Sequence, residues 1–203
     1  SGGLNNGSAI IYESNQSSSE FGFSVATAGD INGDGFSDVI IGAHEYDNGS
    51  TGEGAAFVYL GAATGMGATA GWSAEGNQSN SYFGGSVSSA GDVNGDGYSD
   101  VIVGASIFDN GSTGEGAAFV YHGSVTGLST FSNWSAEGNQ TSAYFGHSVS
   151  KAGDVNGDGY SDVIIGAYSF INGQNNEGTA FVYHGSASGL SLTSNWSAEG
   201  NQT

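Results

Sequence analysis

Short apolar stretches separated by glycine-rich polar segments recur along the chain. In the first third, residues 21–28 alternate between apolar and small polar side chains, and residues 39–43 are almost wholly apolar. Residues 55–60 and 70–74 form two further apolar stretches. Their length, their β-branched and aromatic content and their flanking glycines are typical of β-strands, and none has the period and capping residues of a helix. The pattern therefore predicts an all-β fold in which 39–43 is covered on both faces.

The whole pattern repeats with a period of 62 residues. The recurrence is clearest at a Phe-Gly pair, a Gly-Ala pair and a Trp-Ser-Ala-Glu segment, which begin at Phe21, Phe83 and Phe145, at Gly42, Gly104 and Gly166, and at Trp72, Trp134 and Trp196. Residues 10–16 are a diverged copy of the Trp segment, so the period starts at Leu4. The chain is therefore a single repeat array over residues 1–203, with units 4–65, 66–127 and 128–189 and a partial fourth unit, 190–203.

Four strands in about 60 residues, repeated along the chain, predict the blades of a β-propeller. A single four-stranded antiparallel sheet cannot bury both of its faces, so the blades are expected to stack on one another. Three blades are fewer than the four to eight that usually close a propeller. We therefore expect the ring to be completed by oligomerisation, for example by two chains, or by a longer chain. In such an assembly residues 190–203 could complete a neighbouring blade, and the open blade edges invite self-association.

A nine-residue segment lies between the first and second predicted strands of each unit. Its first copy, residues 30–38, is Asp-Ile-Asn-Gly-Asp-Gly-Phe-Ser-Asp. Oxygen-bearing side chains stand at positions 1, 3, 5 and 9, and glycines at positions 4 and 6 permit the positive φ angles of a tightly curled loop. With the backbone carbonyl of position 7, these hard oxygen donors suit Ca²⁺, with water completing the shell. The predicted ligands are Asp30, Asn32, Asp34, Phe36, Asp38, Asp92, Asn94, Asp96, Tyr98, Asp100, Asp154, Asn156, Asp158, Tyr160 and Asp162, where Phe36, Tyr98 and Tyr160 contribute their carbonyls.

The segment departs from an EF-hand after its ninth residue. An EF-hand requires a bidentate Glu at position 12, where this chain has Ile41, Val103 and Ile165. The alternative is an Asx-rich turn that binds no metal. Three carboxylates in each loop would then repel one another at contact distance, and this favours the metal-binding interpretation. We therefore expect about three Ca²⁺ per chain.

The charge balance narrows the classes of partner. The chain has 20 acidic residues and one basic residue, Lys151, and its formal net charge is −19. A surface this negative repels nucleic acid and anionic lipid, so we expect neither as a partner. No apolar run has membrane-spanning length, and no signal peptide is visible at the start, which implies that any such signal has been removed from a secreted form. Weak calcium loops suit the millimolar calcium outside cells, so an extracellular or cell-surface location is expected.

The order Phe-Gly, then Asp-x-Asn-Gly-Asp-Gly-x-x-Asp, then Gly-Ala resembles the FG-GAP repeats of integrin α-subunit propellers and their bacterial relatives. The proline that follows Gly-Ala in the family is replaced here by His44, Ser106 and Tyr168. The resemblance implies a propeller with calcium loops on one face and longer connecting loops on the other, where partners often bind. It implies a calcium-stabilised extracellular adhesion or recognition module, with a protein or glycan ligand on a cell surface or in the matrix.

Two other functions remain open. The recurring tryptophans could stack on sugars in a carbohydrate-binding lectin, although packing between blades also explains them. The open edges would also suit a self-assembling structural protein of a surface layer or filament. An enzyme is not expected, because no Ser/His/Asp or paired-carboxylate set stands apart from the repeat.

Two further sets of residues differ in how strictly they repeat. A glutamate recurs before each third strand, at Glu53, Glu115 and Glu177. It could take part in binding at the loop face, but a solvated turn carboxylate is the favoured interpretation. The four residues after each Gly-Ala pair vary strongly, at 44–47, 106–109 and 168–171. This variation indicates either a partner-binding surface or drift on an unconstrained one.

Overall fold

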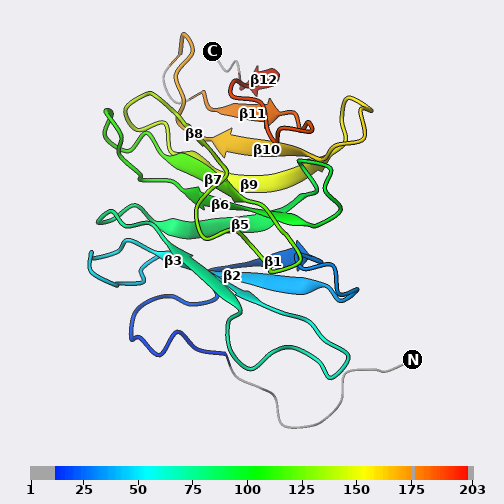
Figure 1. The fold of residues 1–203 in the computed structure, drawn as a ribbon. Helices are drawn as coiled ribbons and strands as arrows, with labels where there is room; N and C mark the ends of the chain where they lie inside the picture. The colour runs from blue at the N-terminus through cyan, green and yellow to red at the C-terminus, as the bar shows by residue number, and fades with distance from the viewer. Residues whose placement is uncertain (1–11, 175–176, 201–203) are drawn as a thin grey trace.

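The computed structural model describes residues 12–174 and 177–200, which form twelve β-strands and no helix (Figure 1). None of the described segments is therefore a helix of the length and apolar character that crosses a bilayer. The strands are β1 (Ser24–Gly29), β2 (Asp38–Ala43), β3 (Ala55–Tyr59), β4 (Trp72–Glu75), β5 (Phe83–Gly91), β6 (Asp100–Ala105), β7 (Ala117–Tyr121), β8 (Trp134–Glu137), β9 (Phe145–Gly153), β10 (Asp162–Ala167), β11 (Thr179–Tyr183) and β12 (Trp196–Glu199). The predicted all-β fold is confirmed.

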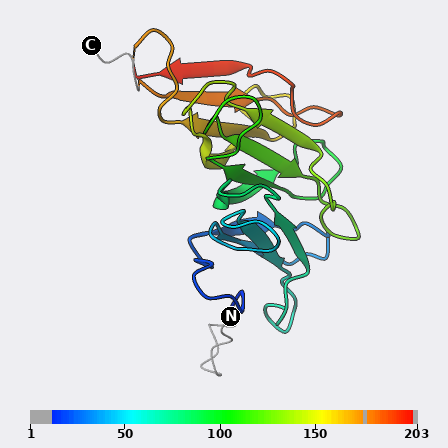
Figure 2. The ribbon, with the colours of Figure 1, turned by 90° about the vertical axis from the view of Figure 1, so that its left-hand side faces the viewer.

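The strands form three antiparallel sheets, each with its four strands in chain order: β1 to β4, β5 to β8, and β9 to β12. These are the three predicted blades, and they stack in chain order, with the first and third sheets at opposite ends of the array (Figures 1 and 2). The array is open, because one face of the first sheet and one face of the third are not covered by another described sheet.

The sheets are offset from the 62-residue sequence units. Strand β4 lies in the unit 66–127 but pairs with β3, so it is the outer strand of the first sheet. In the same way β12, within the partial unit 190–203, pairs with β11 and completes the third sheet of its own chain. Each sheet therefore takes its first three strands from one unit and its fourth from the next.

Successive sheets are held together by apolar clusters. At the first junction, Ile31 of the first sheet packs with Val87, Tyr121 and Leu128 of the second, and all four are at most 8% exposed. An equivalent cluster fills the second junction. Each junction therefore buries apolar side chains that a single blade alone would leave exposed to water.

The recurring tryptophans belong to these junctions. The Trp72 ring meets Tyr121 of the next sheet edge-on, with ring centroids 4.9 Å apart, and Trp134 meets Tyr183 in the same way at 4.9 Å. The Trp72 Nε1–H also donates a hydrogen bond to the carbonyl of Ser129, 2.9 Å away. These two tryptophans therefore have the packing role that was the alternative to sugar binding.

The glycines of the Phe-Gly and Gly-Ala pairs allow the sheets to approach closely. A Cβ atom placed on Gly104 would lie 1.9 Å from the carbonyl oxygen of Gly146 in the next sheet. The same distance, 1.9 Å, separates a Cβ placed on Gly42 from the carbonyl of Gly84. Only glycine fits here, because both contacts are with backbone that cannot rotate away.

This contact predicts a large difference between two equivalent glycines. Gly104→Ala is expected to destabilise the protein by at least about 3 kcal/mol, since the methyl group must push two backbones apart. Gly166→Ala is the matched control, because its Cβ would meet only the Ser148 hydroxyl within its own sheet, at 2.4 Å, and that side chain can rotate. Urea unfolding in calcium buffer at low protein concentration should show less than about 1 kcal/mol for the control. Equal losses for both variants would contradict the packing account.

Candidate metal centres

The three nine-residue segments form equivalent loops between the first and second strands of each sheet. The loop residues 30–37, 92–99 and 154–161 precede β2, β6 and β10, and the ninth residue of each segment begins that strand. The two strands flanking each loop pair antiparallel, with a register irregularity next to the loop in all three sheets. A loop within a strand hairpin was predicted, and the structure shows it.

The first aspartate organises the loop around its own carboxylate. Asp30 Oδ1 accepts hydrogen bonds from the backbone N–H groups of Gly33, at 2.7 Å, and Asp34, at 3.1 Å. Its Oδ2 accepts one from Gly35, at 2.9 Å. Both glycines have positive φ angles, 73° and 87°, which a tight curl around a central carboxylate requires. The other two loops repeat these bonds.

The donors at positions 3 and 5 turn inward through similar bonds. Asn32 Oδ1 accepts from the N–H of Asp34 at 3.1 Å, and Asp34 Oδ1 accepts from the N–H of Phe36 at 2.9 Å. The side-chain amide of Asn32 donates to Asp34 Oδ2 at 3.0 Å. The side-chain oxygens of positions 1, 3 and 5 therefore all accept hydrogen bonds from groups of their own loop.

The ninth residue differs from the others because it is buried. Asp38, Asp100 and Asp162 are each 0% exposed. Asp100 Oδ2 accepts from the N–H of Val93 at 2.8 Å, and its Oδ1 accepts from the N–H of Gly123 at 2.9 Å. This carboxylate therefore links the loop to the turn that follows β7.

Burial has a strong effect on the ninth carboxyl. It raises the pKa of Asp100 to about 7, and the nearby charges of Asp96 and Asp92 raise it further, against the lowering effect of the two backbone hydrogen bonds. Burial also raises the pKa of Asp38. At the first position of the third loop, hydrogen bonds from the backbone of Gly159, Gly157 and Asp158 lower the pKa of Asp154, which is exposed. In the first two loops the neighbouring aspartates therefore disfavour the charged form of the ninth carboxyl.

The loops also form part of the contacts between sheets. The carbonyl oxygens of Asp30 and Ile31 accept hydrogen bonds from Ser99 and Ser124 of the second sheet, at 2.9 and 3.1 Å. The ring of Tyr98 lies against Gly33, where an added Cβ would be 2.8 Å away. Whatever fixes the loop conformation therefore also fixes the junction between two blades.

The donor set has the chemistry that Ca²⁺ requires. Every side-chain donor is a carboxylate or amide oxygen, and a carboxylate retains acceptor capacity beyond the bonds described, because its two oxygens offer about four lone-pair sites. Within the described residues, only His44 forms ion pairs with acidic side chains, so no basic side chain balances the loop charges. The residues thus fit calcium in the type and charge of their donors. No three Asp, Glu, His or Cys side chains of the described part are arranged as a complete metal site.

The comparison with known protein families decides the classification. The family model of the FG-GAP repeat matches residues 21–59, 83–121 and 145–183, which is more than half of the chain. This chain belongs to the FG-GAP repeat family. Each matched segment begins at the Phe-Gly pair and ends with the third strand of a sheet, so the three FG-GAP repeats correspond to the three blades.

Integrin α-subunits are among the curated relatives. The chain is 35% identical to human integrin alpha-6 over 160 residues, which cover 78% of this chain and 13% of that protein. It is 36% identical to Drosophila melanogaster integrin alpha-PS2 over 162 residues, covering 73% and 11%, and 32% identical to Xenopus laevis integrin alpha-5 over 183 residues, covering 86% and 16%. The chain is thus an integrin-like FG-GAP propeller module that spans a small part of the length of these relatives.

The expectation of solvated glutamates before the third strands is wrong for two of the three FG-GAP repeats. Glu53 and Glu115 are 1% exposed. Glu53 Oε1 accepts hydrogen bonds from the N–H groups of Asn48 and Ser50, so it fixes the loop between β2 and β3 from inside. The exact recurrence of the glutamate could have indicated this role, since a free surface carboxylate has no reason to repeat.

Proposed function

We propose that this protein is a calcium-stabilised adhesion or recognition module of the extracellular space or cell surface. The observation that carries the proposal is the donor set repeated in three loops, without a compensating basic side chain, at the places where consecutive blades meet. The integrin α relatives support a surface recognition role. The millimolar calcium outside cells would fill loops of this kind even at modest affinity.

In this proposal the first, third, fifth and ninth side chains and the seventh carbonyl of each loop hold one Ca²⁺. The ion supplies positive charge that offsets the repulsion among the three carboxylates. The chain itself holds the loop in shape, because the Asp30 carboxylate accepts hydrogen bonds from the loop backbone. The buried Asp38 links the loop to Gly61 by accepting a hydrogen bond from its N–H at 2.8 Å. A fixed loop then presents the carbonyls of Asp30 and Ile31 to the next blade. Calcium is thereby linked to blade stacking.

The recognition surface is proposed at the opposite end of the blades, in the loops between the second and third strands. The backbone of these loops is held by hydrogen bonds to the glutamate carboxylates inside them. A glutamine of the preceding segment binds each loop as well. Gln78, for example, exchanges two hydrogen bonds with the backbone of Asp109, at 2.7 and 2.8 Å. The residues that vary between repeats, 44–47, 106–109 and 168–171, begin these loops directly after the second strand of each sheet. Variable side chains on a fixed backbone are the arrangement expected of a binding surface.

Aromatic side chains gather beside these loops. Tyr168 is 53% exposed and stacks on Tyr144, with ring centroids 5.0 Å apart, and His147 meets Tyr168 edge-on at 4.7 Å. At the first sheet, the exposed Phe23 packs on His44 at 3.9 Å. Partly exposed aromatic pairs of this kind are enriched in protein-binding sites.

A binding experiment tests the recognition role. The purified protein, in millimolar calcium, is screened against immobilised extracellular matrix proteins and a glycan array. The expected result is saturable binding to a protein that weakens at least 10-fold in Tyr168→Ala and is unchanged in Phe131→Ala, since Phe131 is an 84% exposed aromatic residue on a different loop. No binding to either panel would contradict the recognition role. Binding to glycans alone, lost in Trp196→Ala, would instead establish the lectin, since Trp196 is 52% exposed.

A further inference from the structure

The outer face of the third sheet exposes residues that the inner junctions bury. Val155 is 56% exposed, whereas Ile31 and Val93, at the equivalent positions of the first and second sheets, are 0% exposed. Trp196 is 52% exposed, whereas Trp134 is 6% exposed. Val155 and Trp196 line an apolar pocket together with Val182, His184 and Asn195 among others.

The outer face of the first sheet likewise exposes residues whose equivalents are buried at the inner junctions. Val25 is 65% exposed, whereas its equivalents Val87 and Val149 are 7% and 8% exposed against the preceding sheet. Phe36 is 40% exposed; its equivalent Tyr98 lies against the loop of the preceding blade. The two ends of the array are therefore the two sides of one kind of junction.

The backbone groups at the two ends are complementary as well. At each inner junction the first two carbonyls of a loop accept hydrogen bonds from N–H groups of the next sheet. At the second junction these donors are Ser161 and Ser186, at 2.9 and 3.0 Å. The carbonyls of Asp154 and Val155 accept no such bond within residues 12–174 and 177–200. The matching donors on the first sheet, by the 62-residue period, are the N–H groups of Ser37 and Ala62. Neither donates a hydrogen bond in the described part of the chain.

We propose that a second copy of this chain docks head to tail, with the outer face of its first sheet on the outer face of the third sheet. The junction would repeat those already present between consecutive sheets. In the first junction Leu128 of the next blade packs in the apolar cluster that includes Ile31 and against which Trp72 lies. The equivalent of Leu128 in the first blade is Met66, which in the docked copy fills the pocket of Val155 and Trp196. Both halves of the interface stand on this one chain and in the register of its inner junctions, and this continuity with the inner junctions supports another copy of the chain as the occupant.

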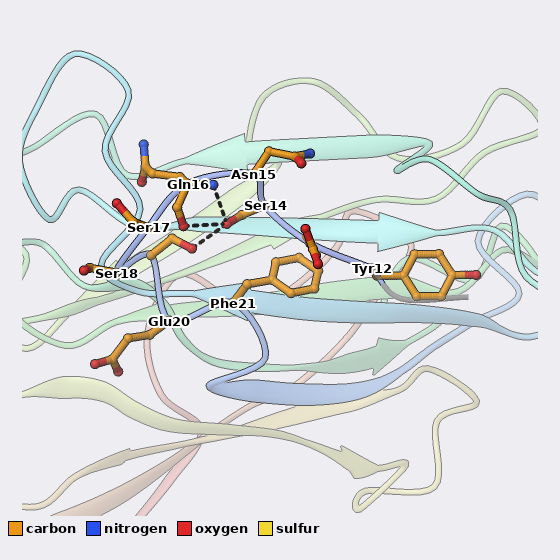
Figure 3. A pocket seen from close by; sticks show the side chains of 10 residues that line it. Tyr12, Ser14, Asn15, Gln16, Ser17, Ser18, Glu20 and Phe21 are labelled. Carbon is orange, nitrogen blue, oxygen red and sulfur yellow. Dashed lines mark hydrogen bonds between the residues drawn. The ribbon is translucent and has the colours of Figure 1, made fainter. Parts of the chain in front are cut away.

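Docking of the copy requires one contact on the outer face of the first sheet to be broken. Tyr12 meets Tyr59 edge-on at 4.5 Å, in the place where a preceding blade would put its tryptophan, as Trp72 does against Tyr121. Tyr12 belongs to the segment that lines an open hollow with Ser14, Gln16 and Phe21 (Figure 3). Its hydroxyl is buried without a hydrogen-bond partner among the described residues, which is unfavourable. Trp196 of the docking copy displaces Tyr12 from Tyr59.

The mass of the protein in calcium buffer tests this proposal. Sedimentation or light scattering over a range of concentrations is expected to give a multiple of 20.3 kDa, either a closed pair or longer head-to-tail assemblies. Val155→Asp is expected to give a monomer with an unchanged circular dichroism spectrum. Phe131→Asp changes an apolar residue of the middle blade that is even more exposed, at 84% against 56% for Val155, and is expected to assemble like the wild type. A wild-type protein that is monomeric at every concentration would overturn the proposal.

Two further variants locate the faces. Val25→Asp alone and Val155→Asp alone are each expected to be monomeric, but an equimolar mixture restores one intact junction and gives a two-chain species. A face-to-face interface between identical surfaces would give no such restoration, and that result would overturn the head-to-tail arrangement.

The strength of association provides an independent readout. Gly166→Ala is expected to weaken it at least 10-fold, because the added methyl occupies the place of the Gly22 carbonyl of the docked copy. The inner contacts of Gly42 with Gly84 and of Gly104 with Gly146 define that place. Tyr12→Ala is expected to strengthen association, since it removes the competitor of Trp196. Unchanged association in both variants would refute the assignment of these faces.

Discussion

Removal of calcium is expected to lower the melting temperature of this FG-GAP protein by roughly 20 °C. A ligand at 100 times its dissociation constant that binds only the folded state contributes about 2.7 kcal/mol, so three sites contribute about 8 kcal/mol. In a chain of this size 1 kcal/mol shifts the melting temperature by about 2–4 °C. The measurement is a thermal melt of calcium-stripped protein with and without added CaCl₂. Magnesium at equal concentration is the control, since it demands a stricter octahedral geometry and gives up its water reluctantly.

The size of this calcium effect should depend on pH. In calcium-free protein the pKa of Asp100 is about 7, above its usual value, so its neutral form contributes stability at acid pH that is lost as the pH rises through 7. The nearby groups are Asp92, Asp96 and His122, and burial lowers the pKa of His122, so this imidazole is neutral at pH 7.5. Calcium has to displace the proton of Asp100 at pH 5 but not at pH 8. The calcium-dependent shift in melting temperature is therefore expected to be larger at pH 8, and an equal shift at both values would contradict a site that includes Asp100.

The strands and the loops were predictable because their causes are local. The apolar run 39–43, which follows the acidic loop, predicts a strand, and β2 is that strand. Its residues alternate between buried and half-buried because one face of the first sheet is uncovered, whereas the equivalent β6 is buried throughout, as expected of a strand covered on both faces. Likewise the glycines at positions 4 and 6 require a curl, and the structure gives Gly33 and Gly35 positive φ angles. The sequence period also revealed the number of sheets, because each period carries one complete set of strands.

Features that depend on how a loop or strand folds against the rest of its own sheet were not predictable in this way. Asp38, Asp34 and Asp30 are equally acidic in the sequence, yet only Asp38 is buried, because the turn at Gly61 closes over it. Glu53 looks like a surface turn residue until the loop between β2 and β3 folds around it. The grouping of β4 with the preceding unit also depends on pairing with β3, which the repeat register does not reveal. In each case the environment is decided by a folded contact that the sequence pattern does not reveal, whether the partner is five residues away, as for the N–H donor to Glu53, or 23, as for Asp38 and Gly61.

The ninth and fifth residues of one loop should therefore respond very differently to substitution. Asp100→Ala is expected to cost about 5 kcal/mol in calcium buffer. It removes a proposed calcium ligand, worth about 2.7 kcal/mol, and leaves the buried N–H groups of Val93 and Gly123 unpaired, at about 1–3 kcal/mol each. Asp96→Ala removes a ligand of the same type from an exposed position, where water replaces its bond to Tyr98, and is expected to cost about 2–3 kcal/mol.

Repeating both measurements after calcium removal separates the two roles of these carboxylates. Asp96→Ala is then expected to be neutral or slightly stabilising, because one of three like charges is gone and no ion is lost. Asp100→Ala should still cost at least about 2 kcal/mol, because its two hydrogen bonds are needed with or without the ion. Urea unfolding of both variants in the two buffers measures the four values. If Asp96→Ala lost as much stability without calcium as with it, the loop would be a structural turn and its carboxylates would not serve as metal ligands.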